Sequence, residues 1–149
     1  MPTTSTQKKT RRRSSIAVQR TVRGAPPAAL LRGFALAVDS GVSVTIRIVG
    51  AAESRLLNKT FRNKAHPTNV LSFSYGRGHG DIVLCHPVIR KEARAQGKPL
   101  RAHYAHLVVH GVLHLRGHDH VTKRGAARME RREIRILRRL GVGDPYAVR

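Results

Sequence analysis

The chain is short and strongly basic. Its 149 residues suffice for one domain with its own core and are too few for two domains of usual size. With 29 Lys and Arg against 8 Asp and Glu, the net charge of +21 repels itself unless a polyanion binds, which favours a nucleic-acid partner. No apolar run is long enough for a membrane span, because the best candidate, residues 25–38, is broken by Arg32 and Gly33.

Residues 1–13 differ in composition from the rest of the chain. They carry five basic side chains and no acid, so we expect a disordered basic arm, followed by one domain over residues 14–149. An organelle transit peptide is the alternative for this arm, because an Arg-rich, Ser-rich and acid-poor composition is typical of both. The single cysteine, Cys85, cannot form an intramolecular disulfide, which favours the cytoplasm and a buried apolar role for this residue.

Apolar periodicity predicts interleaved strands and helices. In chain order we expect a strand over residues 16–22, a helix opened by Pro26-Pro27 and ended by residues 39–41, a strand over 42–48 and a helix over 51–62. A third strand over 70–73, a glycine-rich loop over 76–80 and a fourth strand over 81–85 come next. Helices follow over residues 87–96, 100–115 and 122–140. This mixture predicts an α+β or mixed α/β fold.

The segment HGVLHLRGHDH holds four histidines in eleven residues. On a helix, His110 and His114 share one face, so both imidazoles can reach one small ion. Gly117 lets the chain leave the helix sharply and return with a third ligand, which the spacing makes His120, with His118 as the competing choice. Three protein nitrogens leave a fourth position for water, the arrangement of a catalytic rather than a structural zinc site.

The same spacing, H-x-x-x-H-x-x-G-x-x-H, is the frame of the metzincin proteases, so a metalloprotease is the first alternative. Those enzymes place a general-base Glu directly after the first His, where this chain has Gly111. Asp119, the nearest carboxylate, is expected to orient a ligand imidazole rather than act as the base. His103 and His106 extend the same helix face, but a hydrogen-bonded structural role is favoured for both, and neither is assigned to the metal.

Two segments together resemble the YbeY family of bacterial endoribonucleases, also described as ribosomal RNA maturation factors. HGVLHLRGHDH resembles the family's H-G-x-L-H-L-x-G-x-D-H element, and Leu57-Asn58 through Phe61-Arg62 into PTNVLSF resembles its other signature. Similarity continues through Gly80-Asp81-Ile82, Gly97-Lys98-Pro99 and the closing LG and DPY segments. It covers nearly everything after the arm.

The resemblance implies both a fold and a chemistry. It implies a mixed sheet of about four strands flanked by helices, with the zinc site on a long late helix and the loop after it. One zinc ion per chain would be held by His110, His114 and His120, and Arg62 would be a functional arginine. The implied activity is cleavage of single-stranded RNA in maturation of the 16S ribosomal RNA 3′ end and in ribosome quality control, with the ribosome or small-subunit proteins as partners.

The expected catalytic residues are Arg62 together with the metal-binding His110 and His114. A planar guanidinium binds phosphate oxygens bidentately and stays charged at any working pH, so Arg62 is expected to stabilise developing phosphate charge. The uncharged polar groups near the third strand are expected to bind the sugar or to cap local backbone; they belong to Thr68, Asn69 and Ser72.

Two other function classes stay open at this point. The chain could be a non-catalytic, RNA-binding ribosome-assembly factor with a structural zinc, or a zincin-like metallohydrolase of another substrate class; imidazoles also accept nickel, copper or iron. Two departures from the family are a short connection over residues 75–80 and a basic last helix, where many relatives are acidic. Residues 122–140 carry eight Lys or Arg against Glu130 and Glu133, a pattern that fits RNA binding and a solvated surface equally.

Overall fold

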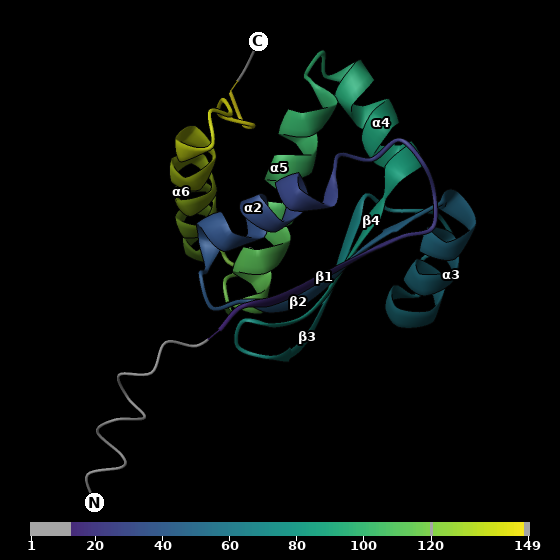
Figure 1. Cartoon of the computed structure of the whole chain (residues 1–149), viewed down its shortest axis with the longest axis horizontal. Helices are drawn as coiled ribbons and strands as arrows, with labels where there is room; N and C mark the ends of the chain where they lie inside the picture. Colours follow the sequence, from purple (N-terminus) through teal and green to yellow (C-terminus); the bar gives the residue numbers. More distant parts are fainter. Residues whose placement is uncertain (1–12, 120, 148–149) are drawn as a thin grey trace, which may run out of the picture.

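A four-stranded sheet organises residues 13–119 and 121–147, the part of the chain that the computed structural model describes (Figure 1). The strands are β1 (Ser15–Arg20), β2 (Ser43–Val49), β3 (Val70–Gly76) and β4 (His79–Cys85), in the order β1-β2-β4-β3. β1, β2 and β4 are parallel, whereas β3 runs antiparallel to β4. The five helices of the described residues are α2 (Ala28–Val38), α3 (Ala51–Arg62), α4 (His86–Ala95), α5 (Leu100–Leu115) and α6 (Lys123–Arg139). The predicted mixed sheet with five helices is confirmed.

The side chains of β2 pack against helices on both faces of the sheet. Val44, Ile46 and Ile48 are buried in one large apolar cluster with residues of α2 and α5, whereas Val49 belongs to a smaller cluster next to Leu57 of α3. Helices therefore cover both faces of the sheet, as its parallel strands require. None of the described helices combines the length and the apolar character of a membrane span.

Helix α5 lies at the centre of the molecule, between the sheet and α6 (Figure 1). Between His103 and Leu115 every side chain of this helix is buried except those of His106, His110 and His114. A helix that is apolar on nearly all sides belongs in a core. The three histidines, four residues apart, are therefore the only open seam on this part of α5.

The hairpin of β3 and β4 is tighter than the predicted loop over residues 76–80. β3 continues to Gly76 and β4 begins at His79, so that Arg77 and Gly78 alone form the turn, with Gly78 at a positive φ of 72°. Gly80 lies inside β4. A glycine is needed there because a Cβ atom would come within 2.1 Å of the Phe73 carbonyl oxygen. The glycines were typical of a loop, but Gly80 serves close packing within the sheet.

We expect Gly80→Ala to lower the free energy of unfolding by roughly 3 kcal/mol, because the new methyl group would press on the backbone of β3. Gly33→Ala is the matched control: Gly33 lies within α2 with open space around its Cα, so the same change should stabilise the protein by about 0.5–1 kcal/mol. Urea unfolding measures both. Equal shifts in the two variants would contradict the close approach at Gly80.

Candidate metal centre and active-site cleft

His110 and His114 converge on the open side of α5. The Nε2 atoms of the two rings lie 3.1 Å apart, and the ring centroids are separated by 4.7 Å. Two nitrogens bound to one tetrahedral zinc ion at about 2.0–2.1 Å lie about 3.3 Å from each other. The predicted pair is therefore already at the separation that a shared ion requires.

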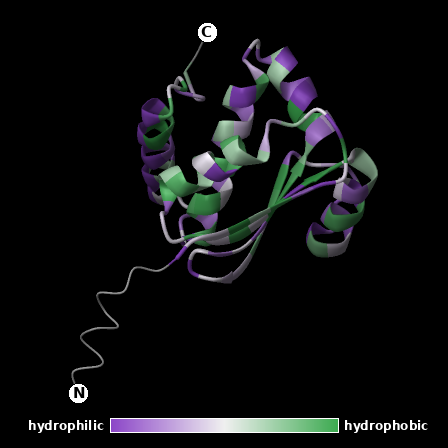
Figure 2. Ribbon diagram, viewed as in Figure 1, coloured by the Kyte–Doolittle hydropathy of each residue, from purple (hydrophilic) through white to green (hydrophobic). Residues whose placement is uncertain are grey.

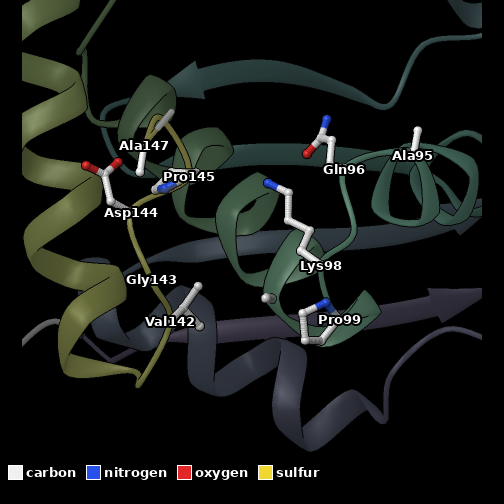
Figure 3. A pocket seen from close by; sticks show the side chains of 10 residues that line it. Ala95, Gln96, Lys98, Pro99, Val142, Gly143, Asp144, Pro145 and Ala147 are labelled. Carbon is white, nitrogen blue, oxygen red and sulfur yellow. The ribbon is translucent and has the colours of Figure 1, made fainter. Parts of the chain in front are cut away.

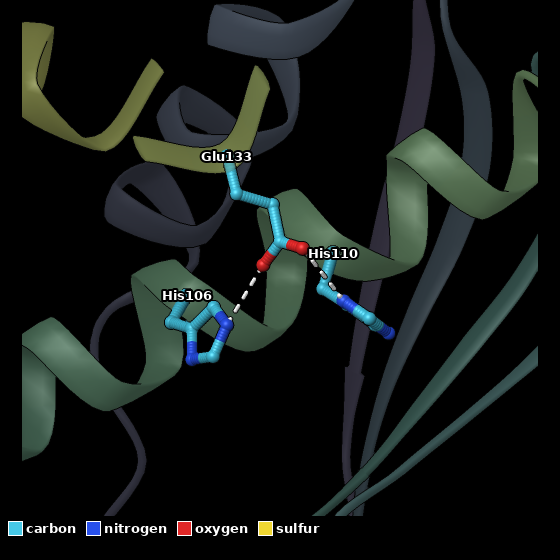
Figure 4. A group of neighbouring side chains, drawn as sticks. All are labelled: His106, His110 and Glu133. Atoms are coloured by element: carbon cyan, nitrogen blue, oxygen red, sulfur yellow. Dashed lines mark hydrogen bonds and ion pairs between the residues drawn. The ribbon is translucent and has the colours of Figure 1, made fainter. Parts of the chain in front are cut away.

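The second ring nitrogen of His110 faces helix α6. His110 Nδ1 lies 3.2 Å from Glu133 Oε1, and the other nitrogen of the ring points away from this carboxylate (Figure 4). Because an ionised carboxylate only accepts hydrogen bonds, Nδ1 carries the hydrogen and Nε2 keeps its lone pair. This is the tautomer that a histidine needs in order to bind a metal through Nε2.

Glu133 is held as a carboxylate inside the protein. Its side chain is 1% exposed and also accepts hydrogen bonds from His106 Nε2 at 2.8 Å and from the Tyr146 hydroxyl at 2.9 Å. Burial opposes its ionisation, but the hydrogen bonds from His106 and His110 outweigh burial and lower the pKa of Glu133 to about 2. The group therefore stays charged and fixes the rings on α5.

The same residues form a second arrangement of ligand atoms. Among the described residues, His106, His110 and Glu133 make up the one group of three whose possible ligand atoms all lie within 4.8 Å of one another. The late helices thus carry a candidate His/His/Glu metal site. A metal ion bound by this group would use His110 Nδ1, whereas an ion shared with His114 would use His110 Nε2. One ion cannot bind both nitrogens of one ring, so the two sites are alternatives for a single ion.

The loop after α5 is only partly described. His120, the predicted third ligand, lies outside the described residues, and its competitor His118 joins no group of three ligand atoms within the described ranges. The Asp119 carboxylate accepts a hydrogen bond from the backbone N–H of Val121 at 3.1 Å. The carboxylate that the structure pairs with His110 is therefore Glu133 rather than Asp119.

Sequence reasoning missed Glu133, although a signal for it exists. Glu133 lies on the same buried face of α6 as Met129, Ile136 and Leu137. A charged residue among the apolar positions of an amphipathic helix is rarely buried without a partner. That position alone indicates a buried hydrogen-bonding role.

A cleft of about 480 Å³ runs along α5 and β3 beside the two histidines. The predicted substrate-binding residues and two of the predicted metal ligands all line it: Arg62, Thr68, Asn69, Ser72, His110 and His114. These residues come from the end of α3, the segment before β3, β3 itself and α5. The fold thus brings six predicted site residues to one place.

Arg62 closes helix α3 at the wall of this cleft. Asn63, in the left-handed conformation with φ of 55°, ends the helix directly after it. The guanidinium is exposed and forms no ion pair or hydrogen bond with any residue that the structure describes. It is therefore available for an anionic group in the cleft.

The segment before β3 is fixed by polar contacts. The Asn69 side-chain nitrogen donates to Glu92 Oε1 at 3.0 Å, and the same carboxylate oxygen accepts from His103 Nε2 at 2.8 Å. The backbone N–H of Thr68 donates to Ser54 Oγ at 3.0 Å. The side chain of Asn69 is thus held against Glu92 at the wall of the cleft.

Gly111 has a packing role in this site. A Cβ atom at this position would lie 3.0 Å from Ile82 Cδ1 and 3.2 Å from Ser72 Oγ. Helix α5 therefore approaches the sheet closely at the point where the cleft forms. A larger residue at position 111 would push Ile82 and Ser72 aside by a few tenths of an ångström, so this close packing favours glycine over the glutamate of the metzincin frame.

A second cleft, of about 430 Å³, lies between the turn that joins α4 to α5 and the C-terminal segment (Figure 3). Lys98 and Asp144 are among its lining residues. Within the described ranges, Asp144 is the one carboxylate that lines this cleft, and no described histidine or cysteine does so. It is therefore not the metal centre.

Comparison with known proteins decides the family. A family model described as Endoribonuclease YbeY matches residues 6–141. The chain belongs to the YbeY endoribonuclease family. An Endoribonuclease YbeY from Aromatoleum aromaticum is 51% identical over 126 residues, which cover 82% of each chain. Another from Methylibium petroleiphilum is 49% identical over 121 residues, covering 79% of this chain and 81% of that protein.

A solved structure has the same fold. The solution structure of TM1509 from Thermotoga maritima matches with a TM-score of 0.58 and 22% identity, covering 89% of this chain and 99% of that chain. The family resemblance that the sequence motifs predicted is confirmed, and membership makes the chain a metal-dependent endoribonuclease.

We expect Glu133→Gln to weaken metal binding about 10–100-fold, because an amide cannot accept from three donors at once and no longer fixes the His110 ring. Glu130→Gln, on the same helix and with the same loss of charge, is the control. Competition with a chromophoric chelator gives the affinity, and circular dichroism checks the fold. Equal metal affinity of the two variants would rule out an orienting role for Glu133.

Proposed function

We propose that the chain is a zinc-dependent endoribonuclease that cleaves single-stranded RNA. Residues 14–149 would form its one catalytic domain, and residues 1–13 a basic arm. The observation that carries this proposal is the convergence of His110 and His114 with Arg62 in one cleft of a YbeY-family chain. Metal-binding and phosphate-binding groups then face the same ligand.

We place one zinc ion per chain on His110, His114 and His120. The separation of the two Nε2 atoms and the tautomer set by Glu133 support this choice over the His106, His110 and Glu133 group. When bound, a zinc ion lowers the pKa of water to about 7 and offsets negative charge on a phosphate oxygen.

The residues of the cleft would bind and orient the RNA. Arg62, exposed at the cleft wall, would pair with the oxygens of the scissile phosphate and stabilise the charge that builds up there. Thr68, Asn69 and Ser72 line the same wall, and their polar side chains would offer partners for the ribose. The attacking oxygen is either water or the ribose 2′-hydroxyl. A 2′,3′-cyclic phosphate end would identify the second.

The shape of the cleft favours a single strand. Its volume of about 480 Å³ is that of a pocket for a small molecule, which suits an unstacked nucleotide better than a duplex. Family membership and the basic charge support ribosomal RNA as the substrate, with maturation of the 16S RNA 3′ end and ribosome quality control as the processes. The ribosome or its small-subunit proteins would then be partners, in the cytoplasm.

Histidine substitutions test the metal ligands. We expect His114→Ala and the double change at His110 and His114 to abolish bound metal and RNA cleavage while leaving the fold intact, since both side chains lie on the open seam of a buried helix. His106→Gln should keep the metal. Elemental analysis, single-stranded RNA cleavage and thermal unfolding give the three readouts. Unfolding of His114→Ala would indicate a structural zinc, and metal loss in His106→Gln would indicate the His106, His110 and Glu133 site.

Substitution of Arg62 tests the phosphate contact. We expect Arg62→Ala to lower kcat/KM on single-stranded RNA by about 10²–10³-fold with unchanged metal content, and Arg62→Lys to recover only part of the loss. Arg55→Ala, an exposed arginine of the same helix, is the control for charge. Equal kcat/KM values for the Arg62 and Arg55 variants would exclude Arg62 from the reaction.

A further inference from the structure

The outer side of α6 carries a continuous row of arginines. Five of them follow one another at spacings of three and four residues and the sixth is adjacent to the fifth, so that all lie within an arc of about 100° of the helix surface, in a row about 23 Å long. All are exposed: Arg124, Arg128, Arg131, Arg135, Arg138 and Arg139. We call these six residues the arginine row.

Packing on α5 fixes the direction of the arginine row. Met129, Glu133, Ile136 and Leu137 are the buried residues of α6 and lie on the side opposite the row. Helix α6 forms the outer edge of the molecule, and its surface is largely hydrophilic (Figures 1 and 2). The row therefore points into solvent, away from the metal centre.

No acidic group of the described chain offsets this charge. None of the six guanidinium groups forms an ion pair or a hydrogen bond with a described residue. The two acids of the helix lie outside the arc, Glu133 on the buried side and Glu130 at its flank. Like charges three and four residues apart destabilise a helix, whereas a solvated surface normally mixes both signs. A bound polyanion would remove this repulsion.

The residue type indicates the chemistry of the partner. The arc contains arginine and no lysine, and a planar guanidinium binds phosphate oxygens through two parallel hydrogen bonds. A helix that lies on a membrane needs large apolar groups beside its cations, and no exposed large apolar residue belongs to α6 among the described residues. Phosphates of a nucleic acid therefore fit the row better than a lipid surface.

We propose that the arginine row is a second RNA-binding surface, which holds the phosphate backbone of the substrate outside the segment that is cleaved. This inference rests on the endoribonuclease activity and deepens the choice of substrate. The row and Glu133, which contacts His110, lie on opposite sides of α6, about 10 Å apart. Only an RNA longer than the segment in the cleft can reach both surfaces, so the enzyme would favour long RNA.

The test removes four charges from the row and four from elsewhere. The row variant changes Arg128, Arg131, Arg135 and Arg138 to Gln. The control variant makes the same change at four exposed cations of α3 and α4, namely Arg55, Arg90, Lys91 and Arg94. Both lose the same net charge, and Gln keeps helix propensity close to that of Arg and Lys. Circular dichroism and thermal unfolding establish that both variants fold.

Fluorescence anisotropy then measures binding to a 2′-O-methyl RNA of roughly 40 nucleotides over a range of salt concentrations. We expect the row variant to bind at least about tenfold more weakly than the control variant. The slope of log K against the logarithm of the salt concentration should also be smaller in magnitude by about 2 to 3, since each lost phosphate contact contributes about 0.7 to this slope. Equal affinities and slopes in the two variants would overturn the proposal. The proposal would also be overturned if the row variant bound RNA as tightly as the control variant but no longer bound phosphatidylglycerol vesicles or polyglutamate.

Cleavage assays separate this proposal from the catalytic one. On a long single-stranded RNA, kcat/KM should fall in the row variant only, whereas on an oligonucleotide just long enough for the cleft it should match that of the control variant. Equal losses of the row variant on both substrates would overturn a remote binding surface. If the unmodified protein cleaves neither RNA, the catalytic proposal fails, and the anisotropy result still decides the arginine row.

Discussion

The site depends on the hydrogen bonds that the buried carboxylate of Glu133 accepts. It joins three segments that are far apart in sequence, because its donors are His106 and His110 of α5 and Tyr146 after α6. A buried charge is tolerated only when its hydrogen-bond capacity is filled, so α6 must pack on α5 in the one register that brings these donors together. The same contacts set the tautomer of His110, and the packing of two helices thereby becomes part of the metal centre.

Helix α5 provides the other constraint, since it is both the core of the molecule and the base of the cleft. From residue 103 to 115 every side chain of this helix is buried except those of the histidine seam, which therefore forms the base of the cleft. Because Gly111 has no side chain, the helix can approach β3 and β4 so closely that a methyl group at this position would crowd Ile82 and Ser72. Arg62 and Ser72 then line one cleft with the histidines, next to the close contact between α5 and the sheet.

Local patterns in the sequence predicted what depends on local geometry. The helical spacing of His110 and His114 was enough to predict their convergence, and apolar periodicity predicted the helix over residues 51–62 with its observed limits. Arg62 came only from the family motif, because its place in the cleft depends on the packing of α3. Glu133 and the strand position of Gly80 were missed since each is decided by a partner distant in sequence or on another strand. The third predicted ligand, His120, lies outside the described residues.

The chain order of the centre has a consequence for protein synthesis. All four strands and α5 precede residue 116, so a growing chain can complete its sheet before Glu133 and Tyr146 have been translated. Until then nothing anchors the His110 ring from the side of α6. An endoribonuclease assembled in this order acquires its finished catalytic geometry last, so the site of a nascent chain stays incomplete until residues 133–146 have been made.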